Sequence, residues 1–107
     1  MKDLEIKDSK EPKYNLDTIK LVFQSVDKLN MTASAMQGQY GLGFSDEDVV
    51  DAIQALKDMD FYKSMPPKHT SFSAWQDVYK STFKEVGLYI KFQIDKRGEV
   101  IISFKAR

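Results

Sequence analysis

The chain of 107 residues contains no cysteine and only one histidine. The absence of cysteine excludes disulfides, thiolate zinc sites and a cysteine nucleophile. A single histidine, His69, cannot form a histidine-based metal site, nor can it provide the pair of histidines that act as general acid and general base in some active sites. It follows two prolines in an expected loop, and we assign it no role. The sequence therefore predicts neither a metal nor a cofactor.

Long apolar runs are also missing. No run approaches the roughly 20 residues that a helix needs to span a bilayer. The first 13 residues are charged and show no signal-peptide pattern. We therefore expect a cytoplasmic protein with no membrane partner.

An excess of charge of one sign is absent as well, because 16 Lys and Arg balance 16 Asp and Glu. The balance hides an asymmetry between the two halves. Residues 1–60 carry 7 Lys and 12 acidic residues, whereas residues 61–107 carry 9 basic and 4 acidic residues. This division indicates a polyanion partner for the second half, although two solvated faces that differ by chance give the same totals.

The first half of the chain carries helical periodicity. Residues 1–13 are polar and expected to be frayed. Apolar residues then recur at helical spacing after Asn15, a good N-cap, and predict an amphipathic helix over 16–29. Ser45 begins a capping box that predicts a second helix over 45–58. Residues 30–43 between them give no clear pattern, although Thr32 is placed to cap a short helix.

After Asp60 the apolar period becomes two, and aromatic and β-branched residues dominate. Four strands are predicted, separated by a loop over 66–73 and by turns, at residues 61–65, 74–79, 88–94 and 100–105. Helices followed by strands are typical of an α+β domain in which helices pack on one face of an antiparallel sheet. The length favours a single domain over residues 1–107.

The last two predicted strands determine their own register. Gly98 suits the left-handed position of a three-residue hairpin loop, so that Asp95 pairs with Glu99. The next pairs are then Ile94 with Val100, Phe92 with Ile102 and Ile90 with Phe104, and all six residues are apolar. A slip of one residue would place lysine on this apolar face, so the register is strongly favoured.

The opposite face of this hairpin is largely polar and places Tyr89 beside Lys105. Cross-strand neighbours lie about 5 Å apart at Cβ, close enough for a phenol and an ammonium to share one phosphate. A solvated sheet face, which is common in antiparallel sheets, remains the alternative interpretation.

A series of motifs in the second half resembles a known family. The series consists of Asp60-Phe61-Tyr62-Lys63-Ser64-Met65, then Trp75-Gln76-Asp77-Val78-Tyr79, then Leu88-Tyr89-Ile90-Lys91 and Ile102-Ser103-Phe104-Lys105. In this order it resembles the motility and quorum-sensing regulator family of toxins, over residues 11–105. The resemblance implies a RelE-like fold, sequence-selective cleavage of mRNA that halts translation, and an antitoxin encoded beside the toxin. It also implies that operator DNA is contacted only indirectly, through the antitoxin.

The resemblance further implies the site residues. The family's catalytic positions correspond to Lys63, Gln76, Tyr89 and Lys105. Positions expected to contact RNA are Tyr62, Met65, Lys80 and Lys91. At Lys80 some members have arginine, so bidentate phosphate binding would be lost there. The neutral net charge and a somewhat longer loop through residues 66–69 also depart from the family pattern.

Metal-independent cleavage of RNA uses the neighbouring 2′-hydroxyl as nucleophile, and it needs a base, an acid and cations that stabilise the phosphorane. Lys63 is the expected base, provided that neighbouring cations or burial lower its pKa. Lys105 is expected to bind phosphate, Tyr89 to donate a proton or hydrogen bond, and Gln76 to position the substrate.

Two other classes of function remain open from the sequence alone. One is a binding module without activity, such as a degenerate toxin whose basic half meets an acidic protein surface. The other is an RNA-binding regulator that does not cut RNA. Cleavage products with new 5′-hydroxyl ends distinguish an endoribonuclease from both.

Overall fold

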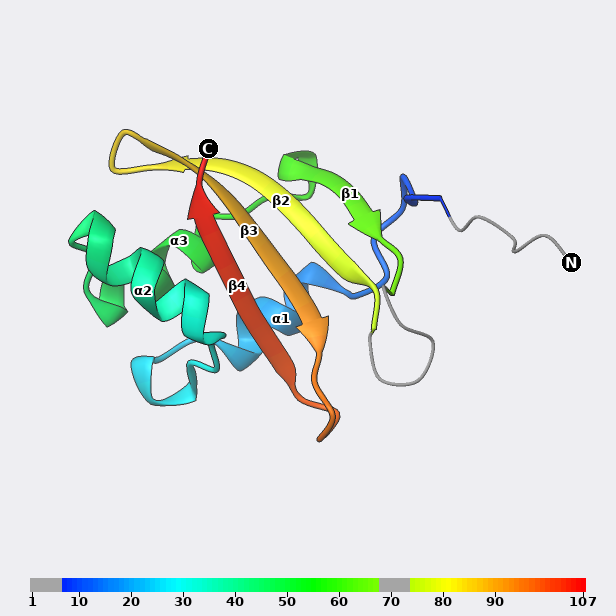
Figure 1. The fold of residues 1–107 in the computed structure, drawn as a ribbon, viewed down its shortest axis with the longest axis horizontal. Coiled ribbons are helices and arrows are strands. Elements are labelled where there is room, and N and C mark those ends of the chain that lie inside the picture. Colours follow the sequence, from blue (N-terminus) through cyan, green and yellow to red (C-terminus); the bar gives the residue numbers. More distant parts are fainter. Residues whose placement is uncertain (1–6, 68–73) are drawn as a thin grey trace, which may run out of the picture.

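A computed structural model describes residues 7–67 and 74–107, and its helices precede its strands (Figure 1). The helices in the described residues are α1 (Leu16–Val22), α2 (Ala33–Leu42) and α3 (Asp46–Gln54), with 3₁₀ turns η1 (Val26–Lys28) and η2 (Asp58–Asp60). The strands are β1 (Phe61–Met65), β2 (Gln76–Phe83), β3 (Val86–Ile94) and β4 (Val100–Ala106). They form one antiparallel sheet in the order β1-β2-β3-β4. The expected α+β fold is confirmed, and the residues 68–73 that contain His69 lie outside the described part.

The first helix is shorter than its apolar periodicity predicts. It ends at Val22, and residues 26–28 form η1 instead of a continued helix. The Gln54 side-chain amide donates to the carbonyl oxygens of Lys20 (2.7 Å) and Phe23 (3.0 Å). These bonds satisfy carbonyls at the end of α1, so the prediction of one helix over 16–29 was wrong because a side chain from α3 ends it.

The caps expected for the other helices are confirmed. Thr32 accepts a hydrogen bond from the backbone of Ala35 at the start of α2, which ends at Gly43 in the left-handed conformation (φ 71°). Ser45 and Asp48 form the predicted capping box of α3. This helix ends at Gln54 rather than at residue 58.

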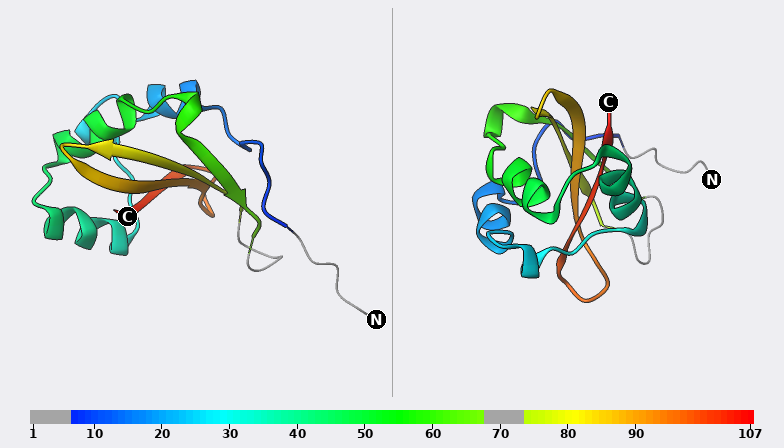
Figure 2. Two further views of the ribbon diagram at one scale, coloured as in Figure 1. Left: turned by 90° about the horizontal axis from the view of Figure 1, so that it is seen from above. Right: turned by 90° about the vertical axis from the view of Figure 1, so that its left-hand side faces the viewer.

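The sheet has one covered face and one open face. Helices α1 and α3 lie together on one side of it, while α2 lies alongside the edge strand β4 and in front of the other face (Figure 2). The buried core between α1, α3 and the sheet includes Phe23, Phe92 and Ile102, none of which is measurably exposed. The expectation that helices pack on one face therefore holds for α1 and α3, whereas α2 protects an edge.

Backbone pairing continues beyond β4 into the segment that precedes α2. Met31 bridges Ile102 in parallel, with hydrogen bonds from Thr32 N to Ile102 O (2.9 Å) and from Ile102 N to Asn30 O (2.8 Å). The Asn30 side chain also donates to the Val100 carbonyl oxygen (3.0 Å). Residues 30–32 therefore occupy hydrogen-bonding groups of β4 that would otherwise form an open edge.

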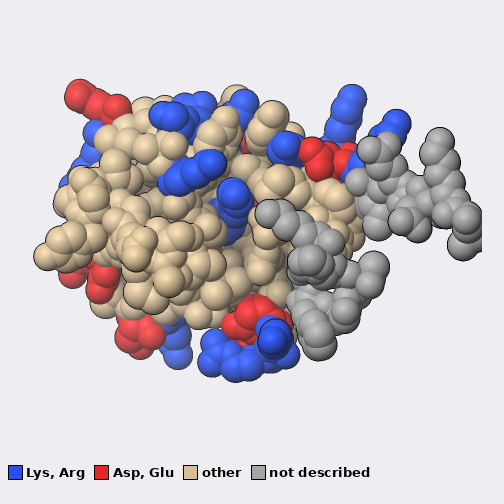
Figure 3. All heavy atoms as spheres, in the orientation of Figure 1, with Lys and Arg blue, Asp and Glu red and all other residues tan. Residues whose placement is uncertain are grey.

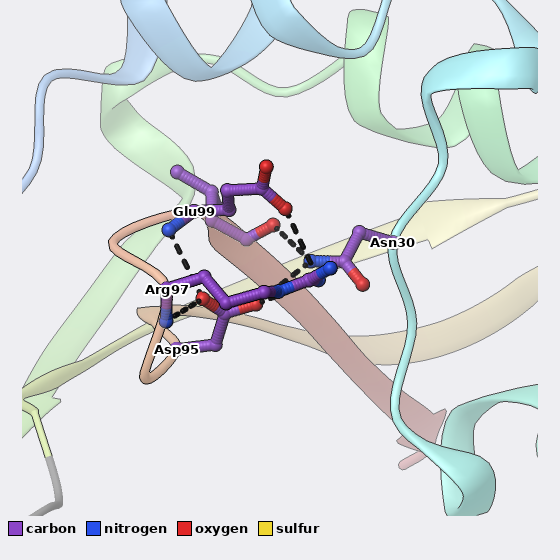
Figure 4. Close-up of polar contacts among 5 residues, drawn as sticks. Asn30, Asp95, Arg97 and Glu99 are labelled. Carbon is purple, nitrogen blue, oxygen red and sulfur yellow. Dashed lines mark hydrogen bonds and ion pairs between the residues drawn. The ribbon is translucent and has the colours of Figure 1, made fainter.

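The β3–β4 hairpin has the predicted register in every pair from Tyr89↔Lys105 to Ile94↔Val100. Gly98 has the left-handed backbone (φ 81°) that the turn requires. The Asp95 carboxylate accepts hydrogen bonds from the backbone N–H groups of Glu99 and Arg97 and contacts the Arg97 guanidinium (Figure 4). These bonds, the one from Glu99 first, lower the pKa of Asp95 to about 2.

The strands of the β2–β3 hairpin are longer than expected, and the turn between them is shorter. Strand β2 runs to Phe83 and β3 begins at Val86, so two residues connect them. Lys84 (φ 49°) and Glu85 (φ 67°) both have left-handed backbones, as in a type I′ turn. Neither residue is a usual choice there, so no turn was predicted at these positions and the predicted second strand stopped four residues early.

A buried carboxylate joins the N-terminal segment to the sheet. Asp77 is fully buried and accepts hydrogen bonds from Lys13 N (2.9 Å), Tyr14 N (2.9 Å) and the Ser64 hydroxyl (2.7 Å). Ser9 and Ser64 exchange two backbone hydrogen bonds of 2.8 Å. The expectation of fraying over residues 1–13 is therefore wrong for the part that includes Ser9 and Lys13.

Replacement of Asp77 by alanine would leave three donors without their acceptor, two of them only partly buried. We expect Asp77→Ala to lower the free energy of unfolding by about 3 kcal/mol or more. Urea denaturation followed by circular dichroism measures this loss. Asp51→Ala, at an exposed position of α3, is the matched control and should change stability by less than about 0.5 kcal/mol. Equal losses in the two variants would contradict the structural role of Asp77.

Candidate functional site

The open face of the sheet carries aligned rows of side chains from all four strands. Here "open face" means the side that α1 and α3 leave uncovered. Because strand residues alternate between faces, the register places three rows on it. The rows consist of Met65, Gln76, Gln93 and Ile101; of Lys63, Val78, Lys91 and Ser103; and of Lys80, Tyr89 and Lys105, with Tyr62 beside this last row.

A β-bulge in β1 allows Lys63 and Met65 to reach this face. Phe61 pairs with Tyr79 on the core side, but Lys63 pairs with Val78, so Tyr62 is an extra residue in β1. Strict alternation from Phe61 would have put Lys63 and Met65 into the core. The sequence prediction of a strand over 61–65 did not include this bulge. The bulge changes which face of the sheet the residues after Tyr62 occupy.

The predicted site residues mostly gather around one hollow of about 260 Å³. Its lining includes three of the four predicted catalytic residues and three of the four predicted RNA contacts. The lining residues are Tyr62, Lys63, Met65, Val78, Tyr89, Lys91 and Lys105. Val78, between Lys63 and Lys91, was not predicted, because an apolar residue among lysines carries no chemical signal by itself.

The two remaining predicted residues lie on the same face beside the hollow. Gln76 pairs with Met65 in the register and does not line the hollow. Lys80 places its ammonium 3.8 Å from the centre of the Tyr62 ring and 5.8 Å from that of Tyr89. All eight predicted residues are therefore on the open face, six around the hollow and two next to it.

Aromatic rings and ammonium groups alternate across this face. The rings of Tyr62 and Tyr89 have centroids 6.3 Å apart and are tilted by 31°. The ammonium of Lys63 lies 5.2 Å from the Tyr62 ring, on which Lys80 also sits. Tyr62 is 46% exposed, so part of this ring is available to a ligand, and a nucleobase is the kind of group that stacks on such a ring.

The charge of the open face is positive. Its strand residues named above include four lysines and no Asp or Glu. Figure 3 shows basic side chains at the middle of this face and acidic side chains toward its margins. The four lysines are Lys63, Lys80, Lys91 and Lys105. The charge asymmetry in the sequence thus corresponds to a basic face in the structure.

One acidic residue does contact the site from the N-terminal segment. Asp8 forms an ion pair with Lys63, with Oδ2 3.1 Å from Nζ. The hydrogen bond to Asp8 raises the pKa of Lys63 above its ordinary value, with smaller contributions from the charge of Asp8 and the two tyrosines. The role of base expected for Lys63 required a lowered pKa, so the structure favours a cationic Lys63 instead.

Groups of three or more His, Asp or Glu side chains suited to a metal ion do not occur in the part of the chain that the structure describes. The same residues contain no helix long and apolar enough to cross a membrane. The polar side chains that line the hollow are lysines and tyrosines.

Two comparisons identify the family of the chain. Residues 11–106 match the family described as motility quorum-sensing regulator, toxin of MqsA. The chain is also similar to the mRNA interferase toxin MqsR of Escherichia coli (strain K12), with 30% identity over 80 residues that cover 75% of this chain and 80% of the relative. The match to the family extends across both helical and sheet regions and includes every residue around the hollow. The chain therefore belongs to the motility quorum-sensing regulator family of toxins.

Proposed function

We propose that this protein is an mRNA interferase, a toxin of a type II toxin–antitoxin system that cleaves mRNA with sequence selectivity and so inhibits translation. The observation that carries the proposal is the hollow in which Lys63, Tyr89 and Lys105 converge on a basic, aromatic face. Family membership and the mRNA interferase name of the E. coli relative support the same activity.

The proposed reaction is transfer of a phosphodiester to the neighbouring 2′-hydroxyl without a metal. The 2′ oxygen attacks phosphorus and releases its proton to solvent, and the bond from phosphorus to the 5′ oxygen breaks as that oxygen takes up a proton. The products are a 2′,3′-cyclic phosphate and a free 5′-hydroxyl, so the reaction is balanced without any cofactor. Negative charge grows on the phosphorane oxygens as the reaction proceeds, and fixed cations stabilise that charge.

Each group around the hollow has a place in this reaction. Lys63 and Lys105 hold the phosphate from two sides, and Lys91 lies between them on the same face. The Tyr89 hydroxyl donates a hydrogen bond or proton toward the leaving 5′ oxygen. Gln76, next to the hollow, positions the nucleotide. Since Lys63 is held as a cation by Asp8, catalysis depends mainly on electrostatic stabilisation rather than on Lys63 as a base.

The proposed partners follow from this activity. The substrate is mRNA, which places the site of action in the cytoplasm. The protein partner is an antitoxin of the MqsA kind, encoded beside the toxin. Operator DNA is reached only through that antitoxin.

A second candidate function is RNA binding without cleavage. The raised pKa of Lys63 favours this function, because a cationic Lys63 does not act as the general base that the sequence predicted. Both functions use the same basic face, and only the chemistry of the RNA ends separates them.

Incubation of the purified protein with a long RNA in EDTA tests cleavage directly. We expect fragments with 5′-hydroxyl ends from the wild type. Lys105→Gln and Tyr89→Phe should each reduce the rate roughly tenfold or more, because each removes one stabilising group from the transition state. Lys28→Gln, which removes a lysine outside the open face, should leave the rate unchanged. Bound but intact RNA, with and without ribosomes, would favour the non-cleaving function.

Two exposed tyrosines provide a matched test of base stacking. Tyr62 borders the hollow, whereas Tyr40, on α2, is 90% exposed and belongs to a different surface. We expect Tyr62→Ala to weaken the binding of single-stranded RNA by about 1–3 kcal/mol, the usual contribution of one stacked base. Tyr40→Ala should not change the binding. Fluorescence anisotropy with a labelled oligonucleotide measures both, and equal effects would refute a stacking role for Tyr62.

The pKa of Lys63 distinguishes a cation from a base. We expect a pKa above the ordinary lysine value in the wild type and a lower pKa in Asp8→Asn, because the substitution removes the carboxylate that stabilises the charged amine. Carbon-detected NMR titration of the lysine side chains measures both values. A wild-type pKa at or below the ordinary value would restore the base role for Lys63.

A further inference from the structure

A fourth row of residues lies on the open face next to Lys80, Tyr89 and Lys105. The register pairs Thr82 with Gly87, and the backbone N–H of Arg107 donates to the Gly87 carbonyl oxygen (2.8 Å). The Arg107 guanidinium lies over this row, with Nη2 3.3 Å from the Thr82 hydroxyl oxygen. Residues from β2 and β3 and the residue that follows β4 thus come together in one place.

Gly87 makes room for the guanidinium. A Cβ atom at this position would lie 3.0 Å from Arg107 Nε and 3.2 Å from Nη2. These contacts are tight, so a side chain at position 87 would require the guanidinium to shift by a few tenths of an ångström. The absence of a side chain at Gly87 therefore lets the guanidinium lie close to the sheet.

Apart from its hydrogen bond to Thr82, the Arg107 guanidinium has donors available to a ligand. The guanidinium carries five N–H donors, and among the described residues it forms no ion pair with a carboxylate. Arg97, on the β3–β4 turn, differs in this respect because it contacts both Asp95 (3.2 Å) and Glu99 (3.0 Å). An arginine without an acidic partner, beside a hydroxyl and lysines, is suited to a phosphate oxygen.

The position of this row relates it to the proposed reaction. Same-face residues on one strand are about 6.6 Å apart, so the fourth row is one such step from Tyr89 and Lys105. A polynucleotide whose cleaved phosphate lies over the hollow has another phosphate within reach on each side. The fourth row lies on one of these sides.

We propose that Arg107, Thr82 and Gly87 form a second phosphate-binding site, which holds the RNA phosphate next to the cleaved one. This inference rests on the proposed function. The site assigns a direction to the bound strand, which runs along the sheet from the hollow toward the β2–β3 turn.

The test measures the binding of an RNA oligonucleotide that carries 2′-fluoro groups in place of the attacking 2′-hydroxyls. Its affinity is determined over a range of salt concentrations, since each phosphate contact in a single strand contributes about 0.7 to the slope of log K against log salt. We expect Arg107→Gln to weaken binding several-fold and to reduce this slope by about 0.7. Arg97→Gln, the matched control, should leave the slope unchanged.

Gly87→Ala tests the geometry while Arg107 is retained. The added methyl shifts the guanidinium by a few tenths of an ångström, so the slope should fall by less than in Arg107→Gln. The double variant should show no more loss than Arg107→Gln, because both substitutions act on the same contact. Circular dichroism checks that each variant is folded, and Thr82→Val, which removes the hydroxyl at nearly constant volume, should give a smaller loss in the same direction.

The outcomes separate this inference from the proposed function. If the wild type cleaves RNA but Arg107→Gln has the same slope and affinity as Arg97→Gln, the second phosphate site is refuted and the proposed function stands. If the wild type neither cleaves nor binds RNA, the proposed function fails and this inference fails with it.

Discussion

The hydrogen bonds to the buried Asp77 carboxylate are the interaction on which the rest of this structure depends. The carboxylate is fully buried, and its partners come from the segment before α1 and from β1. A buried charge is unfavourable unless hydrogen bonds satisfy it, so these partners have to be in place together. The consequences extend to the titration of a neighbour, because burial and then the charge of Asp77 raise the pKa of Tyr79 to about 12. The same carboxylate fixes the position of β1, which carries Lys63.

The open face acquires its chemistry from two local irregularities and one regular hairpin. The bulge at Tyr62 turns Lys63 and Met65 away from the core, and the tight turn at Lys84 and Glu85 extends β2 and β3 past the hollow. The regular β3–β4 hairpin places Tyr89 beside Lys105. Without the bulge, Lys63 and Met65 would face the core, and the basic face would lose one of its four lysines.

The sequence predicted those features that depend on residues close together in the chain. The β3–β4 register followed from the apolar alternation around Gly98, and the capping box followed from Ser45 and Asp48. The tight turn at Lys84 and Glu85 was missed because neither residue is a usual choice for a left-handed backbone. The other main features it missed depend on partners far away in the sequence. The end of α1 depends on Gln54, the order of the N-terminal segment depends on Asp77, and the bulge depends on how β1 meets β2. The candidate site residues came from the family resemblance, and the structure adds the hollow that brings most of them together.

The parallel bridge between Met31 and Ile102 has a consequence for how copies of this protein behave in solution. An exposed edge strand is a template on which another chain can add a strand, and aggregation often begins there. Residues 30–32 occupy the edge of β4, and α2 lies alongside it. Extension of the sheet through β4 would require this segment to detach first. A folded molecule is thereby protected at that edge from the indiscriminate self-association that an uncovered apolar β-hairpin invites.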